Sequence, residues 1–330
     1  MKTSPLSRRR FVKQGTAALA VAAAPSLWLP GEPHAAGTTA SRPVRFGGPV
    51  FQAPKDPDEL ARAHRQLGYD AAYCPGVSLD DTDRIRALRE AFAREHVVLA
   101  EVGRWVNLLD ANPDQRRANL ATVTDGLALA EEVGALCCVD IAGSFSPKEW
   151  YGPHPDNVSP RFFEAAVENA RKIIDAVKPK RAKFCYEMMG WALPDSPDSY
   201  LELMKAIDRP AFGVHLDPCN LVNSPSRFYR HRELLHECFN KLGPQIVSCH
   251  AKDLTWDVEM NVHFREVQPG LGAIDYAPFL KRLAALPHQP PLMMEHLRTA
   301  EEYAAAATHI RQVAREHDVT LPAPVVGKAH

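Results

Sequence analysis

The sequence lacks an excess of charge of either sign. It contains 39 Lys and Arg residues against 40 Asp and Glu residues, so the formal net charge of the 330-residue chain is −1. No basic patch or stripe occurs outside the extreme N-terminus, and proteins that bind nucleic acids normally have one. We therefore expect no nucleic-acid partner.

Cysteine pairs of the C-x-x-C type are also missing. The chain has seven cysteines, an odd number. Four of them lie inside apolar runs that are typical of strands: Cys137, Cys138, Cys185 and Cys249. A disulfide framework is not expected in a chain of this size, so the thiols are predicted to act as small buried hydrophobic groups.

The apolar run near the N-terminus, residues 16–29, is too short for a membrane-spanning stop-transfer helix. It is rich in alanine and follows Ser7-Arg8-Arg9-Arg10-Phe11-Val12-Lys13. A basic start, a short apolar region and then Pro and Ala residues are typical of an export signal. The alternative is a basic patch ahead of an amphipathic helix.

The paired Arg8 and Arg9, with Phe11, Val12 and Lys13 after them, resemble the twin-arginine signal S-R-R-x-F-[LV]-K. The resemblance implies that residues 1–37 are a signal peptide and linker. It also implies the twin-arginine export machinery as a partner and a periplasmic location. That route carries proteins that have already folded, often around a cofactor, which favours a metal site.

The rest of the chain, residues 38–330, alternates short apolar runs with segments of helical periodicity. Strands are predicted at residues 44–51, 71–77, 97–102, 136–142, 182–188, 212–216, 246–251 and 291–295. Helices are predicted at residues 56–67, 81–95, 113–133, 160–177, 199–207, 226–242, 276–286 and 300–317. Eight such units form parallel pairs and close into a single-domain (β/α)8 TIM barrel of the α/β class. An open doubly wound sheet is the alternative, but no G-x-G-x-x-G follows the first strand.

Polar residues close four successive strands of the predicted barrel, where barrel enzymes place their active sites. These residues are Glu187, Asp217, His250 and Glu295. Three carboxylates in one barrel mouth would repel one another, and burial would remove water from them and from the imidazole. Together these effects cost several kcal/mol unless a cation neutralises the negative charge. The pattern therefore predicts one divalent metal ion, Mn²⁺, Co²⁺, Mg²⁺ or Zn²⁺. The alternative is a network of ion pairs with Lys252, Arg265 and Arg298.

Strand parity makes a further prediction for the stretch at residues 212–220. Alternate side chains of a strand share a face, so His215 and Asp217 point the same way. Asp217 is then a metal ligand or a cap of the next helix. His215, deeper in the strand, is predicted to be a pocket residue.

The four strand ends resemble the metal ligands of the xylose isomerase-like TIM-barrel superfamily, which includes the ketose 3-epimerases. His250-Ala251-Lys252-Asp253 is similar to the H-x-K-D of that superfamily, and residues 269–276 are similar to its P-x-G-x-G-x-I-D-[WY] loop. The resemblance covers residues 44–315. Two positions differ from the epimerases: Asn220 replaces a substrate-binding His, and Met188-Met189-Gly190-Trp191 replaces a segment with a second Glu.

The resemblance implies a metal-dependent sugar isomerase or epimerase that removes a proton next to a carbonyl and proceeds through an enediolate. Glu187 and Glu295 are the implied acid–base pair. The expected substrate contacts are His215, Asn220, Lys252, Arg265 and Trp191. Glu101 and Asp140, which also lie on barrel strands, are additional candidates for the pocket lining. Two alternatives are a metal-dependent lyase or dehydratase acting on keto-sugars or 3-keto glycosides, and a sugar-binding barrel without activity. The oligomeric state stays open, with a homo-oligomer as one option.

Overall fold

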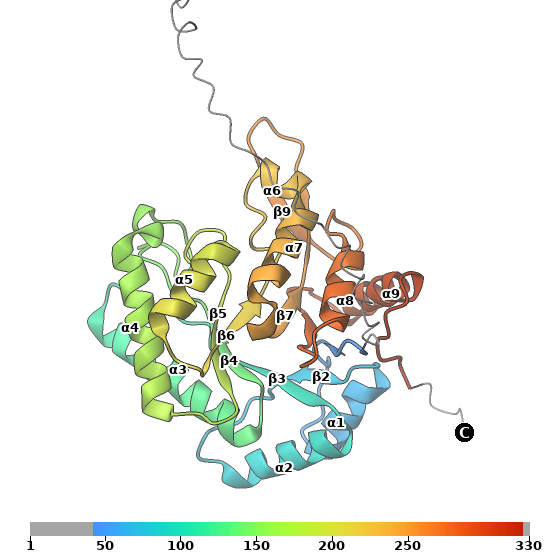
Figure 1. The fold of residues 1–330 in the computed structure, drawn as a ribbon. Helices are drawn as coiled ribbons and strands as arrows, with labels where there is room; N and C mark the ends of the chain where they lie inside the picture. Colours follow the sequence, from blue (N-terminus) through green and yellow to red (C-terminus); the bar gives the residue numbers. More distant parts are fainter. Residues whose placement is uncertain (1–41, 326–330) are drawn as a thin grey trace, which may run out of the picture. The chain divides into compact units, whose positions relative to one another are not determined.

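The computed structural model describes residues 42–325, which form one closed barrel of eight parallel strands (Figure 1). The strands follow the cyclic order β1-β10-β7-β6-β5-β4-β3-β2. Their bounds are β1 Phe46–Gly47, β2 Ala71–Tyr73, β3 Val98–Gly103, β4 Cys137–Asp140, β5 Lys183–Glu187, β6 Phe212–Leu216, β7 Ile246–Ala251 and β10 Leu292–Met294. The predicted (β/α)8 barrel is confirmed, and the open doubly wound sheet is wrong.

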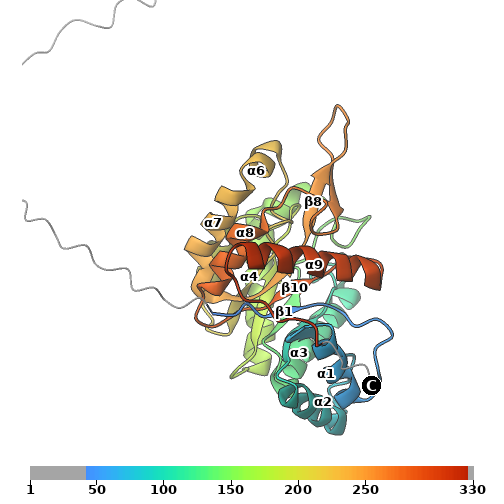
Figure 2. The same cartoon turned by 90° about the vertical axis from the view of Figure 1, so that its right-hand side faces the viewer.

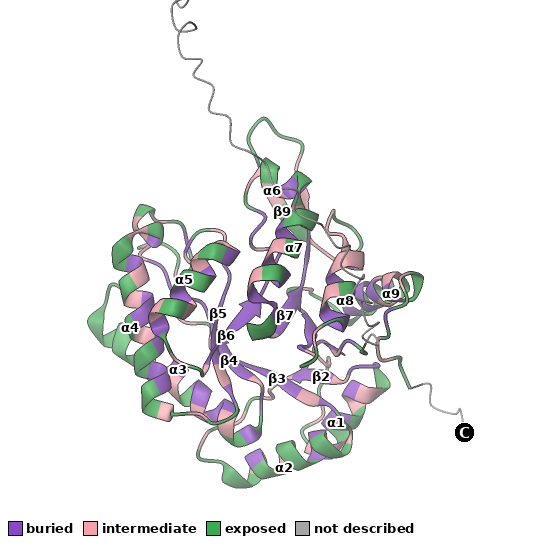
Figure 3. Cartoon of the chain, in the orientation of Figure 1, coloured by how far each residue is buried: buried purple, intermediate pink, exposed green. Residues whose placement is uncertain are grey.

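Helices surround the barrel, with their outer faces exposed and the strands buried (Figures 2 and 3). They are α1 Pro57–Gln66, α2 Thr82–Arg94, α3 Pro113–Val133, α4 Pro160–Val177, α5 Pro197–Ile207, α6 Pro225–Tyr229, α7 His231–Leu242, α8 Tyr276–Ala284 and α9 Ala300–Glu316. Several helices begin with a polar cap followed by Pro, as at Asn112 and Ser159, whose side chains accept backbone N–H bonds of the first turn. Short 3-10 turns lie at Pro155–Val158 and Gly243–Gln245.

The predicted N-terminal signal lies outside the described residues. Among residues 42–325, no helix is both long and apolar enough to cross a membrane. All seven cysteines are free, as expected, and six of them are buried.

Two parts of the fold differ from the prediction. The helix expected at residues 226–242 is divided at Arg230 into α6 and α7. The segment between β7 and α8, in which no helix or strand was predicted, contains an antiparallel hairpin of β8 Asp253–Trp256 and β9 Phe264–Val267. The hairpin projects from the barrel (Figures 1 and 2). Phe228 of α6 stacks on Phe264 of the hairpin, with ring centroids 5.3 Å apart, so the two unexpected features support one another.

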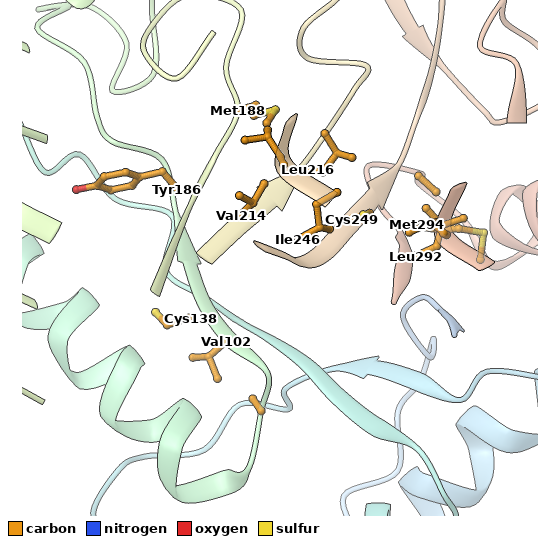
Figure 4. Close-up of a cluster of buried hydrophobic side chains, with 14 of the residues drawn as sticks. Val102, Cys138, Tyr186, Met188, Val214, Leu216, Ile246, Cys249, Leu292 and Met294 are labelled. Atoms are coloured by element: carbon orange, nitrogen blue, oxygen red, sulfur yellow. The ribbon is translucent and has the colours of Figure 1, made fainter. Parts of the chain in front are cut away.

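The largest apolar layer lies between the strands and the helices. Figure 4 shows alternate residues of neighbouring strands in this layer, among them Tyr186, Met188, Val214 and Leu216. The hydroxyl of Tyr186 reaches the carbonyl of Ala166 in α4. Because side chains alternate along a strand, residues between these positions face the barrel interior, and those include Glu187 and His215.

Two bulges change this alternation in β3 and β7. Ala72 pairs with Leu99 but Tyr73 pairs with Glu101, so Ala100 is an extra residue in β3. Similarly, Val214 pairs with Ile246 but His215 pairs with Ser248, so Val247 is extra in β7. A bulge redirects the side chains that follow it, and the interior therefore receives Glu101 from β3 and His250 from β7.

The loop before α8 is organised by Asp253. One carboxylate oxygen accepts the backbone N–H groups of Leu254 and Ile274 at 2.8 and 2.9 Å, and the other accepts those of Gly270 and Gly272 at 3.0 Å each. A Cβ at Gly272 would collide with this carboxylate, so the position requires glycine. The loop is thereby held beside Lys252, whose carbonyl accepts the hydroxyl of Tyr276 at 2.9 Å.

Asp253→Ala would leave four backbone N–H groups without their acceptor. We expect the free energy of unfolding to fall by about 2–4 kcal/mol, because buried donors without partners cost about 1–3 kcal/mol each and some would gain water. Urea unfolding followed by circular dichroism measures the change. Asp257→Ala, which removes only a surface pair with Arg265, should cost no more than about 1 kcal/mol. Equal losses in the two variants would contradict the assignment.

Candidate metal centre and active site

Four side chains from successive strands converge at the carboxyl end of the barrel. Glu187 ends β5, Asp217 follows β6, His250 lies in β7 and Glu295 follows β10. Each offers one ligand atom, and these atoms all lie within 4.8 Å of one another. His250 Nδ1 is 3.1 Å from Glu187 Oε1, 3.8 Å from Asp217 Oδ2 and 2.7 Å from Glu295 Oε1. The four residues predicted as ligands therefore share one small volume.

The donor set fits a divalent metal ion. Oxygen and nitrogen ligands lie about 2.0–2.6 Å from such ions, which separates neighbouring ligand atoms by about 3–4 Å. Asp217 Oδ2 and Glu295 Oε1 are buried oxygens that accept no hydrogen bond of good geometry among the described residues. The ammonium group of Lys252 forms ion pairs with both. Three carboxylates and one imidazole suit Mn²⁺, Mg²⁺, Co²⁺ and Zn²⁺ alike.

The predicted alternative, an ion-pair network, is present only in part. Lys252 Nζ lies 2.9 Å from Asp217 Oδ2, 2.6 Å from Glu295 Oε1 and 3.7 Å from Glu187 Oε1. Arg265 instead pairs with Asp257 at 3.0 Å on the hairpin. Among the described residues, Arg298 has no ion-pair partner within 4.0 Å. Of the three predicted cations, only Lys252 pairs with the cluster.

Electrostatics within the cluster favour ionised groups. Burial alone would raise the pKa of Asp217, but the Lys252 ammonium and His250 outweigh it and hold that pKa well below its usual range. Burial likewise opposes ionisation of Glu295, yet His250 and Lys252 lower the pKa of Glu295 to about 2. For His250, burial alone would lower the pKa, whereas Glu295 and Glu101 raise it well above 6.5. The imidazole must lose its proton before a metal binds, so metal affinity should rise with pH.

A second group of polar residues lies directly beneath the first. Glu101 Oε2 is 3.2 Å from His250 Nε2, and Glu101 Oε1 is 3.1 Å from His215 Nε2 and accepts the hydroxyl of Ser248. All four side chains are buried. Burial alone would raise the pKa of Glu101, but the two imidazoles lower it strongly. The carboxylate thus holds the nitrogen of His250 that faces away from the four-residue cluster, as a carboxylate often does behind a metal-binding histidine.

Sequence reasoning gave little importance to Glu101. The available signal was a single acidic residue inside the apolar run at residues 97–102, and its direction depended on the bulge at Ala100. The structure places His215 beneath the cluster, fully buried, and not in the cavity wall. Asp140, the other additional residue, is buried and accepts the backbone N–H groups of Val106 and Ile141.

The side chain of Asn220 makes three hydrogen bonds at the edge of the cluster. Its Nδ2 donates to Glu187 Oε1 at 3.1 Å and to the carbonyl of Met188 at 3.0 Å, and its Oδ1 accepts Lys252 Nζ at 3.3 Å. The amide therefore orients both Glu187 and the lysine.

A cavity of about 1550 Å³ opens above the cluster. Five of the predicted residues line it: Glu187, Asn220, Lys252, Glu295 and Trp191. Asp217, His250, His215 and Arg265 do not. Aromatic side chains make up much of the remaining wall: Tyr73, Trp105, Trp150, Tyr151 and Phe264. Tyr73 and Trp105 are the aromatic neighbours of His250, with their ring centroids 6.4 Å from that of its imidazole.

Comparison with known proteins identifies relatives of this barrel. A family model described as "Xylose isomerase-like TIM barrel" matches residues 61–313. No curated protein matches the sequence significantly.

Solved structures with the same fold have diverse activities. The apo form of 3-keto-D-glucoside 4-epimerase from E. coli is 16% identical with a TM-score of 0.58, covering 82% of this chain and 99% of that one. A xylose isomerase-like protein from Mycobacterium smegmatis, in complex with magnesium, is 20% identical with a TM-score of 0.57, covering 84% and 98%. Endonuclease IV from Thermus thermophilus is 17% identical with a TM-score of 0.61, covering 83% and 100%. At these identities the likeness shows the fold alone.

Glu101→Gln tests the group beneath the cluster. The amide keeps the size of the side chain but removes the charge that orients His250, so we expect the metal Kd to rise about 10–100-fold. Isothermal titration of the metal-free protein with Mn²⁺ gives the Kd. Glu266→Gln is the matched control, because Glu266 lines the cavity but pairs with His296 and not with His250. An unchanged Kd in Glu101→Gln would show that this carboxylate does not support the metal site.

Proposed function

Because this chain belongs to the xylose isomerase-like TIM-barrel family, we propose that it is a divalent-metal-dependent sugar isomerase or epimerase. The observation that carries the proposal is the ring of Glu187, Asp217, His250 and Glu295 at the floor of a cavity with aromatic walls. Carboxylates supply metal ligands and proton acceptors, and aromatic rings supply surfaces on which sugars stack. A solved structure with the same fold is named as a 3-keto-D-glucoside 4-epimerase, which supports the same class of substrate for this chain.

Two residues of the ring, Glu187 and Glu295, would carry out proton transfer. A bound divalent metal ion would supply Lewis acidity that makes the hydrogen next to a substrate carbonyl more acidic. Glu187 ends β5 and Glu295 follows β10, and β6 and β7 separate these strands in the barrel. The two carboxylates therefore approach the substrate from different sides. One, as the carboxylate, removes the proton to give an enediolate of the sugar. The other first takes a proton from solvent water or a substrate hydroxyl group and then delivers it to the opposite face of the enediolate.

The polar neighbours prepare these two carboxylates. Asn220 holds one oxygen of Glu187 by a 3.1 Å hydrogen bond, which leaves the other oxygen free for the substrate. Lys252 and His250 lower the pKa of Glu295 to about 2, so it is ionised at neutral pH.

Charge on the cavity wall favours a neutral substrate. Four carboxylates line the cavity, those of Glu101, Glu187, Glu266 and Glu295, while Lys252 is its one lysine or arginine within residues 42–325. The lysine is already paired with Asp217 and Glu295. A phosphorylated sugar or a nucleic-acid backbone would find no free lysine or arginine in this described part of the wall, which supports a sugar substrate over endonuclease activity.

A second candidate is a lyase or dehydratase that acts on keto-sugars or 3-keto glycosides. It begins with the same proton abstraction and continues with loss of a group from the carbon beyond. The cavity volume of about 1550 Å³ supports this candidate, because the space above the ring of ligands can hold a leaving group. A sugar-binding barrel without activity is the third candidate.

Glu187→Gln separates catalysis from metal binding, since the amide keeps an oxygen ligand but cannot accept the proton. We expect exchange of the substrate hydrogen for deuterium to fall about 10²–10⁴-fold, with the metal content near that of the unchanged protein. NMR in D₂O of keto-sugars and 3-keto glycosides measures exchange. An epimerised sugar indicates the first function and a released aglycone or water the second. Full exchange by a metal-loaded Glu187→Gln would refute the acid–base role.

We also propose that the protein is exported through the twin-arginine route. Replacing Arg8 and Arg9 together by Lys should keep the uncleaved protein in the cytoplasm, as measured by cell fractionation and immunoblotting. Arg10→Lys is the matched control, because position 10 is the variable one of the motif and export should continue. Export of the double variant at the normal level would contradict the proposal.

A further inference from the structure

The outer part of the cavity has a wall of apolar side chains that the proposed chemistry does not use. Three segments supply it: the loop after β4, the loop after β5 and the β8–β9 hairpin. Their partly exposed apolar side chains that line the cavity are Trp150, Tyr151, Met189, Trp191, Val262 and Phe264. We call these six residues the outer wall. The hairpin also contributes Leu254, His263 and Glu266 to the cavity lining. Trp191 is 63% exposed and Tyr151 46% exposed, so both rings retain free surface.

Hydrogen bonds and stacking hold the outer wall in place. Asn157, which is buried, donates from Nδ2 to the carbonyl of Trp191 at 3.2 Å and to that of Gly152 at 3.0 Å, which joins the loops after β4 and β5. Asn223 donates to the carbonyl of Gly190 at 3.2 Å. Phe264 stacks on Phe228, and the rings of Trp150 and Tyr151 lie 5.2 Å apart. These contacts fix the positions of the loops and the hairpin that carry the outer wall.

Charge divides the cavity into two regions. The carboxylates that could bind a metal lie at the floor, where Tyr73 and Trp105 are the aromatic neighbours of His250. The six residues of the outer wall carry no charge, and Glu266 beside them is paired with His296 at 3.1 Å. A sugar chelated at the floor would satisfy the polar groups there and contact Tyr73 and Trp105. The outer wall would remain in contact with water.

The cavity is also larger than one sugar requires. Its volume of about 1550 Å³ exceeds the roughly 300–1,000 Å³ of pockets that enclose drug-sized ligands, and a single hexose is smaller than those ligands. A wall of exposed aromatic rings gains free energy by covering its apolar surface with another ring.

We propose that the outer wall is a subsite for the aglycone of a neutral glycoside. The oxidised sugar lies at the floor, and the ring attached to it through the glycosidic oxygen stacks on Trp191 and Tyr151. The placement of the sugar rests on the proposed function, whereas the preference for a second ring is a property of the wall and needs no turnover.

The test compares methyl and phenyl 3-keto-β-D-glucopyranoside, which differ only in the aglycone. Isothermal titration of the Mn²⁺-loaded protein should show the phenyl glycoside binding at least about 10-fold more tightly. Trp191→Ala and Tyr151→Ala should each reduce the ratio of phenyl to methyl glycoside affinity to within about threefold of one. Tyr229→Ala is the matched control, because Tyr229 is 80% exposed and lies outside the cavity.

A β-linked disaccharide oxidised at carbon 3 of its non-reducing sugar distinguishes an aryl from a sugar aglycone: the tighter of the two ligands identifies the second ring. Equal affinity for the methyl and phenyl glycosides, or no binding of either, would overturn the subsite. If the phenyl preference appears but no hydrogen exchanges in D₂O, the subsite stands and the proposed isomerase function fails.

Discussion

Repulsion among buried carboxylates is the constraint on which the functional end of this barrel depends. Glu101, Glu187, Asp217 and Glu295 lie close together toward the carboxyl ends of the strands. Lys252 and protonated His250 face them, and His296 lies 3.6 Å from Glu295 Oε2. Such an arrangement costs folding free energy unless further positive charge enters. The hydrogen-bonded barrel holds the groups where they would not collect by themselves. The resulting set of carboxylates and one imidazole is an arrangement that suits a cation.

The residues that close each strand were predictable because the order of strands in a barrel follows from the alternation of apolar runs and helices. That alternation placed Glu187, Asp217, His250 and Glu295 on successive strands. The bulges at Ala100 and Val247 were not predictable, because an extra residue in a short apolar run leaves no pattern in the sequence. The partnership of Glu101 with His250 was therefore missed. The β8–β9 hairpin was missed because its packing on Phe228 is a long-range contact.

Asn220 shows how one substitution can change what a site offers to its ligand. The ketose 3-epimerases that this sequence resembles have a substrate-binding histidine at the corresponding position. Here the amide donates to Glu187 and Met188 and accepts from Lys252, so its polar atoms are occupied within the protein. An amide also carries no charge at any physiological pH, unlike an imidazole. Recognition of the sugar hydroxyl groups must then come from elsewhere in the cavity.

That requirement connects the two regions of the cavity. With Asn220 and Lys252 engaged, the floor has few free donors to distinguish one sugar from another, so most of the remaining contact surface lies on the uncharged outer wall. Stacking on Trp191 and Tyr151 depends on the shape and apolar faces of a ring and is tolerant of its hydroxyl pattern. Under the proposed function, this barrel would select its substrate through what is attached to the sugar, while the geometry of the strand ends would need only a carbonyl with an adjacent hydroxyl group.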